Sequence, residues 1–217
     1  GLHLDQFTTY DFDGFFHDRP VVFMETENGG VKTISAPHMI VTLLHHLELK
    51  EGHEVLVVGS KGGYIAALIA TIVGEQGRVI IIDPSEEIVR HTANALNGWP
   101  TIDLRHVESI DVAPIELPGD LSRILITGSV LSVPTWMEER IVEGGFVIAP
   151  IGDHHHQELM KNERQYDALH PTSLGPVSFG PVDIVESEPQ PLTALEIADL
   201  IETLIETCHE MDLCGAD

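Results

Sequence analysis

Basic residues are scarce in this sequence, and their scarcity limits what the protein can bind. Lysine and arginine together number 11, against 35 aspartates and glutamates, which gives a formal net charge of −24 at pH 7. Proteins that bind nucleic acid set clusters of Lys and Arg against the phosphates. We therefore expect no nucleic-acid partner. The excess of acid favours a strongly solvated surface, and a face that meets a basic partner is the alternative.

Cysteines and long apolar runs are also few. Cys208 and Cys214 have neither the spacing of a redox C-x-x-C motif nor that of a zinc pair, so we interpret them as free thiols of a reducing compartment. No apolar run approaches the ~20 residues that a membrane-spanning helix requires. Residues 1–16 lack the charged and apolar regions of a signal peptide. These features predict a cytoplasmic protein with no membrane partner.

Hydrophobic residues make up 43% of the chain, which is enough for one sizeable core. Short β-branched runs alternate with segments of helical periodicity. This alternation predicts an α/β fold, a mostly parallel, doubly wound sheet with helices on both faces. Strands are expected at 55–58, 78–83, 104–107, 123–127, 145–150 and 177–179, and helices at 35–47, 64–73, 85–96, 134–142 and 193–211. Ser35 is expected to act as the N-cap of the first of these helices.

The predicted organisation has three parts. A turn-rich N-terminal segment covers residues 1–34, the α/β domain covers 35–186, and a C-terminal helix with a tail covers 187–217. The helix at 193–211 carries an apolar stripe, which either docks on the domain or forms the seam of a homodimer.

A glycine-rich turn carries the first sign of chemistry. Gly59-Ser60-Lys61-Gly62-Gly63 lies between a predicted strand and a predicted helix. Glycines let the backbone approach a ligand, and the free N–H groups at the start of a helix bind its oxygens. The next strand ends in Asp83, whose carboxylate can accept hydrogen bonds from both hydroxyls of a cofactor ribose. The combination predicts a nucleotide-cofactor site.

Two cofactors use such sites, NAD and S-adenosylmethionine. The glycines stand at 59, 62 and 63, whereas dinucleotide sites have G-x-G-x-x-G, and this spacing argues against a pyrophosphate ligand. A purely structural interpretation is that Gly62 and Gly63 serve tight packing and Asp83 caps the following helix.

Several motifs, in order along the chain, resemble those of the protein-L-isoaspartate O-methyltransferase family. The most specific is Thr33-Ile34-Ser35-Ala36-Pro37-His38-Met39, which is similar to the T-I-S-x-P segment that precedes the family's cofactor domain. Further on, 47–52 is similar to L-x-L-K-x-G, 59–67 to G-T-G-S-G-Y-x-A-A, and 175–179 to G-P-V-A-F. The resemblance spans residues 18–184.

The resemblance implies a Rossmann-like methyltransferase fold that binds S-adenosylmethionine. It implies methyl transfer to the free carboxylate of L-isoaspartyl residues in damaged proteins, so that isoaspartyl peptides or proteins are the partners. The substrate contacts that it implies, with Ser35 in the catalytic position, are Thr33, Ile34, Ser35, Pro37 and His38. The cofactor contacts that it implies are Gly59, Ser60, Gly62, Gly63, Asp83, Pro84 and Glu108.

This reaction demands little of the side chains. A carboxylate of pKa ~4 is already ionised at pH 7, so no general base is needed. The protein must only align the oxygen with the sulfonium methyl and exclude water. We accordingly expect no catalytic triad and no metal centre, and we interpret the run His154-His155-His156 as a surface loop.

Departures from the family pattern keep other functions open. Val57 stands where the family has an acid, Lys61 replaces the middle glycine of the turn, and Glu108 stands in place of the Asp of G-D-G. A lysine beside a cationic sulfonium is repulsive unless it points to solvent. These changes fit a non-catalytic homologue that serves as an interaction module. A methyltransferase for another substrate, such as tRNA, is a third hypothesis, against which the charge argues.

Overall fold

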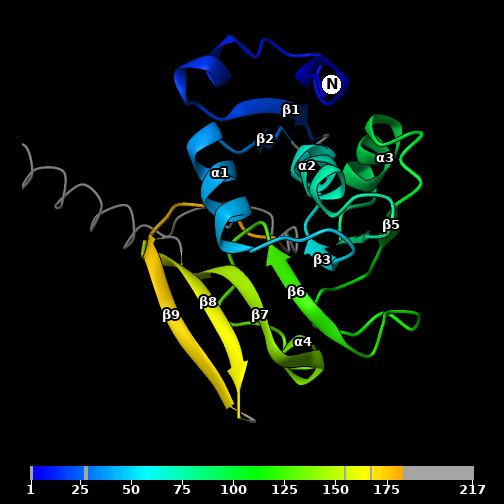
Figure 1. The fold of residues 1–217 in the computed structure, drawn as a ribbon. Coiled ribbons are helices and arrows are strands. Elements are labelled where there is room, and N and C mark those ends of the chain that lie inside the picture. The colour runs from blue at the N-terminus through cyan, green and yellow to red at the C-terminus, as the bar shows by residue number, and fades with distance from the viewer. Residues whose placement is uncertain (1, 27–28, 154, 167, 183–217) are drawn as a thin grey trace, which may run out of the picture. The chain divides into compact units, whose positions relative to one another are not determined.

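The computed structural model describes residues 2–26, 29–153, 155–166 and 168–182 of the chain. Its centre is a seven-stranded sheet with the strand order β5-β4-β3-β6-β7-β8-β9 (Figure 1). The strands are β3 (Glu54–Val58), β4 (Arg78–Asp83), β5 (Ile102–His106), β6 (Leu121–Ile126), β7 (Ile141–Gly152), β8 (Gln157–Gln165) and β9 (Ala168–Pro176). Strands β5, β4, β3, β6 and β7 are parallel, and β8 and β9 continue the sheet antiparallel.

The middle strands are continuous apolar runs because both of their faces are covered. Val57 on β3 lies in register with Ile81 on β4 and with Leu125 on β6, and all three are completely buried. The chain leaves β5 at one side of β3 and re-enters at β6 on the other side. This reversal of strand order opens a crevice at the carboxyl ends of the strands, which is where ligands bind in such sheets.

Helices cover both faces of this sheet. On one face α1 (Pro37–His46), α2 (Tyr64–Val73) and α3 (Glu86–Ala95) share a core with the alternate strand residues Val55, Val57, Val79 and Ile81. On the other face α4 (Thr135–Arg140) packs through Met137 against the remaining strand residues. The predicted Rossmann-like α/β fold is thereby confirmed.

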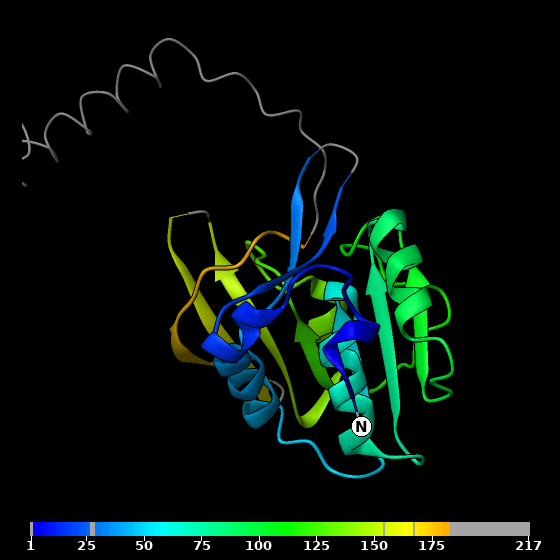
Figure 2. The same ribbon diagram turned by 90° about the horizontal axis from the view of Figure 1, so that it is seen from above.

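The N-terminal segment packs on the first of these faces. It contains two 3-10 helices, η1 (Leu4–Gln6) and η2 (Asp13–His17), and an antiparallel pair formed by β1 (Val21–Glu25) and β2 (Val31–Ile34). Phe7 stands edge-on to Tyr64 of α2, with 5.3 Å between ring centres, and Phe23 joins the same core. Figure 2 shows this segment, in blue, crossing over the side of the domain that carries α1 and α2. Residues 1–184 form one compact unit.

Four local expectations were wrong. Ser35 does not cap α1, because Pro37 forces the residue before it into an extended backbone and Ala36 becomes the N-cap. The helix expected at 134–142 ends at Arg140, where β7 begins. Residues 177–179 form no strand, since β9 ends at Pro176. Strands β8 and β9 were missed because their partly exposed, charged residues lack apolar alternation.

Other expectations fall outside what the structure describes. The predicted helix at 193–211, and with it the homodimer seam, lies beyond residue 182. The three-part division of the chain stays a prediction. Within the described ranges, no helix is both long and apolar enough to cross a membrane.

The central strands should dominate the stability of the domain. Replacing the completely buried Ile81 by alanine should lower the free energy of unfolding by about 2–5 kcal/mol, through lost burial and a residual cavity. Ile72→Ala on α2, where the side chain is 43% exposed, is the matched control and should change it by no more than about 0.5 kcal/mol. Urea unfolding of both variants measures the difference, and equal shifts would contradict this packing.

Candidate functional site

A cleft lies at the carboxyl ends of β3, β4 and β6, where the strand order reverses. Gly59 follows β3, Asp83 ends β4, and Thr127 and Gly128 follow β6; all four line a cavity of about 160 Å³. The Thr127 hydroxyl donates to the Gly59 carbonyl over 2.7 Å and so ties the end of β6 to that of β3. A Cβ at residue 59 would lie 2.5 Å from that hydroxyl oxygen, so the position requires glycine.

Asp83 is the best-connected polar group of the cleft. The residue is only 3% exposed. One oxygen accepts from the Ser60 backbone N–H over 2.7 Å and from the Ser60 hydroxyl over 2.8 Å, and the other accepts from the Ser85 N–H over 2.9 Å. The hydroxyls of Ser60 and Thr92 lie 2.9 Å apart. A carboxylate offers about four acceptor sites, so roughly one of them is left for a ligand hydroxyl.

The turn after β3 therefore has a structural role as well as a place beside the cleft. Residues 61, 62 and 63 all have positive φ, at 45°, 71° and 90°. A Cβ on Gly62 would lie 3.0 Å from the Phe23 ring, and one on Gly63 would lie 3.0 Å from Leu96. Gly62 and Gly63 thus allow close packing and do not line the cavity, and Ser60 is completely buried. Lys61 adopts the left-handed conformation at a cost of roughly 1–2 kcal/mol.

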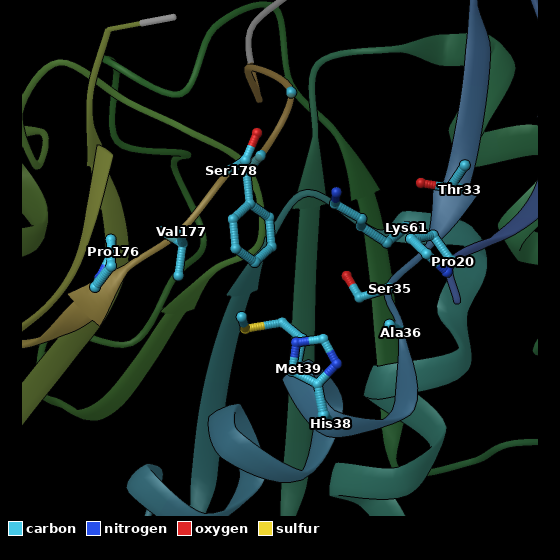
Figure 3. Close-up of a pocket in the computed structure, with 12 residues that line it drawn as sticks. Pro20, Thr33, Ser35, Ala36, His38, Met39, Lys61, Pro176, Val177 and Ser178 are labelled. Carbon is cyan, nitrogen blue, oxygen red and sulfur yellow. The ribbon is translucent and has the colours of Figure 1, made fainter. Parts of the chain in front are cut away.

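A second cavity, of about 480 Å³, adjoins the cleft. Figure 3 shows Thr33, Ser35 and Lys61 on one side of it and Pro176, Val177 and Ser178 on the other. Thr33, Lys61 and Gly180 line both cavities. No hydrogen bond within the described part of the chain uses the hydroxyl of Thr33 or of Ser35. The substrate segment predicted from the sequence therefore faces a cavity with two hydroxyls available to a ligand.

The Lys61 side chain is half-buried and lines both cavities, and Figure 3 shows it extending toward the second one. Its Nζ lies 5.1 Å from the centre of the Phe179 ring, and no carboxylate within the described ranges forms an ion pair with it. Burial, and secondarily the charge of Lys32, lower the pKa of Lys61 to about 8. Lys32 itself lines the cleft, and burial lowers its pKa against the opposing charges of Asp83 and Glu87.

His38 lies at the rim of the second cavity and is held there by a residue far away in sequence. Asp18 accepts the His38 backbone N–H over 2.9 Å, and its other oxygen lies 2.9 Å from the ring Nδ1. These hydrogen bonds lower the pKa of Asp18, the backbone one most. Asp18 thus satisfies an N–H of the first turn of α1, the task that was expected of Ser35.

The remaining predicted residues lie apart from the two cavities. Ile34 is buried in the core, and Pro37 forms the first turn of α1. The Pro84 carbonyl lies 3.2 Å from His106 Nε2. Glu108 lines a separate groove at the end of β5. Sequence reasoning had not singled out Thr127 and Gly128 as lining residues, although their position directly after a buried strand was a usable signal.

The fold matches the Rossmann-like fold of solved methyltransferases. A solved structure described as a protein-L-isoaspartate O-methyltransferase matches with a TM-score of 0.75 at 22% identity, covering 84% of this chain and 58% of that one. Another, from Plasmodium falciparum, is named as a candidate enzyme of the same kind in complex with S-adenosyl-L-homocysteine. It has a TM-score of 0.66 at 22% identity and covers 76% of this chain and 80% of that one.

Sequence comparisons give the family. The model of the protein-L-isoaspartate(D-aspartate) O-methyltransferase family matches residues 5–187. Relatives named protein-L-isoaspartate O-methyltransferase include one from Methanopyrus kandleri, 35% identical over 69% of this chain and 67% of the relative. Another, from Methanococcus aeolicus, is 31% identical over 76% of each chain. The chain belongs to this family.

The hydrogen bonds between Ser60 and Asp83 should be measurable in stability. Ser60→Ala removes one donor from a buried charged acceptor, so we expect a loss of about 1.5–3 kcal/mol in the free energy of unfolding. Ser122→Ala on β6, whose hydroxyl makes no hydrogen bond to the described part of the chain, is the control and should be nearly neutral. Equal effects of the two substitutions in urea unfolding would refute the role given to Ser60.

Proposed function

We propose that this protein is an S-adenosylmethionine-dependent carboxyl methyltransferase that acts on L-isoaspartyl residues of damaged proteins. The observation that carries the proposal is the pairing of a cleft at the switch point of the sheet with a second cavity that bears the Thr33-Ile34-Ser35 segment. The two reactants of a transfer reaction must lie in contact. The two cavities adjoin each other, because Thr33 and Lys61 line both of them.

The residues of the cleft fit the cofactor. Asp83 retains acceptor capacity for a ribose hydroxyl, and Gly59 and Gly128 present backbone without side chains. The cleft is smaller than the ~300–1,000 Å³ usual for ligand pockets. Val182 accounts for part of this, since one of its methyl groups lies 2.7 Å from where a Cβ of Gly128 would stand. When bound, S-adenosylmethionine supplies an electrophilic methyl group on a sulfonium.

The chain's own residues bind and orient the carboxylate. The attacking oxygen is ionised at neutral pH and needs no base. The hydroxyls of Ser35 and Thr33 line the second cavity without partners in the described structure, so they can donate to the substrate's carboxylate and backbone. Pro176, Val177 and Phe179 on the opposite wall exclude water from the reacting oxygen.

The proposal includes two further points. A repair enzyme of this type meets its substrates among intracellular proteins, and we propose the cytoplasm for this one, in line with the interpretation of Cys208 and Cys214 as free thiols. The apolar stripe predicted at 193–211 would form the seam of a homodimer or dock on the domain.

A matched pair of peptides tests the activity. An isoaspartyl peptide incubated with the protein and methyl-labelled cofactor should gain a base-labile methyl ester, whereas the same peptide with ordinary aspartate should gain none. Incorporation into neither peptide by folded protein would favour the non-catalytic role, and equal incorporation into both would contradict the substrate assignment.

Ser35 should matter for transfer more than for folding. Ser35→Ala removes one donor to a charged ligand, for which hydrogen bonds contribute about 1.5–3 kcal/mol, so kcat/KM should fall about 10–100-fold. Thermal unfolding should be little changed, because Ser35 does not cap α1. Ser122→Ala serves as the control, and unaltered kinetics of Ser35→Ala would remove this residue from the site.

A further inference from the structure

Lys61 adopts a backbone conformation that is unfavourable for a lysine. Its φ of 45° lies in the left-handed region, which glycine adopts more easily. The neighbouring Ser60 is anchored to Asp83 by two hydrogen bonds, and Gly62 is packed against the Phe23 ring. The backbone at residue 61 is therefore fixed from both sides, and this holds the lysine side chain between the two cavities.

Among the residues that the structure describes, no counter-ion pairs with the Lys61 ammonium. The charged and titratable groups on the elements around it are Lys32 on β2, His38 on α1 and Asp83 at the end of β4. Lys32 repels it, His38 is paired with Asp18, and Asp83 accepts from Ser60 and Ser85. Within the described ranges of the chain, no carboxylate lines the 480 Å³ cavity.

From this arrangement we infer that Lys61 is a specificity-determining residue, whose ammonium binds the substrate carboxylate in the cavity beside Thr33 and Ser35. The inference rests on the proposed function and names the group that selects the ionised substrate. A cation partly removed from water, next to the Phe179 ring and to two hydroxyls that form no hydrogen bond in the described structure, matches the chemistry of a carboxylate.

The substrate loses its negative charge in the reaction, and this change determines how Lys61 acts on substrate and product. During transfer the bond from sulfur to the methyl carbon breaks, its electron pair stays on sulfur, and a carboxylate oxygen forms the new bond. No proton moves. The substrate carries a negative charge and the methyl ester carries none, so the ammonium holds the substrate and releases the product. Since the attraction is strongest before transfer, it lowers KM and does not raise kcat.

The dependence on pH follows from the same contact. The ammonium is present below the pKa of Lys61, near 8, and is lost above it. A bound carboxylate favours the charged form. Affinity for the isoaspartyl peptide should therefore be high at pH 7 and fall as the pH rises through 8 to 9.5, while the substrate carboxylate stays ionised throughout.

The experiment measures peptide binding by calorimetry on protein saturated with S-adenosylhomocysteine, alongside KM and kcat. Lys61→Gln removes the charge, and Lys61→Gly removes the side chain at a backbone conformation that suits glycine. Both should weaken peptide binding at pH 7 by about 10-fold or more, raise KM similarly, change kcat little and abolish the loss of affinity above pH 8.

The exposed Lys50→Gln is the control and should bind like the parent protein. The methyl ester of the peptide should bind all variants equally.

Several results would overturn the inference. Unchanged peptide affinity in both Lys61 variants would do so, as would a parent protein whose affinity does not fall at high pH. Loss of S-adenosylhomocysteine binding with unchanged peptide affinity would assign the ammonium to the cofactor instead. Methyl transfer that is independent of Lys61 would leave the proposed function standing without this role. Peptide binding that depends on Lys61 without any transfer would support the carboxylate site and refute the proposed function.

Discussion

The buried carboxylate of Asp83 is the interaction on which the site depends. It receives two hydrogen bonds from Ser60, which follows β3, and one from Ser85, which caps α3. One side chain thus joins the ends of two parallel strands to the starts of the next structural elements. Because a buried charge must be well paired to be tolerated, these bonds hold in place a turn whose next three residues all have positive φ.

That turn explains how one departure from the family pattern is compatible with activity. The sequence suggested that Lys61 would repel a sulfonium unless it pointed to solvent. In the structure Lys61 lines both cavities, and the proposed contact with the substrate carboxylate beside Thr33 and Ser35 would offset that repulsion. In this account Asp83 contributes to both reactants: directly to the cofactor through its remaining acceptor site, and indirectly to the substrate by fixing the lysine.

Much of the fold could be predicted, because buried parallel strands are continuous apolar runs and the helix at Tyr64–Val73 ends at a glycine. The outer strands could not, since partly exposed antiparallel strands lack that pattern. Within the site, the sequence predicted a cofactor contact for Asp83 but could not show that Ser60 already donates two hydrogen bonds to one of its oxygens. Nor could it show that Asp18, twenty positions before His38, satisfies the first turn of α1. Contacts between distant residues leave no local signal.

Binding of S-adenosylhomocysteine to the whole chain, measured by calorimetry at low and at high salt, is the decisive test of the role given to Asp83. Two salt concentrations are needed because a net charge of −24 makes the compact state sensitive to screening. We expect binding in at least one of these conditions, and weaker binding by Asp83→Asn in protein that remains folded. Folded protein that binds no cofactor at either salt concentration, or that binds it equally well with Asp83→Asn, would show that Asp83 does not hold the cofactor.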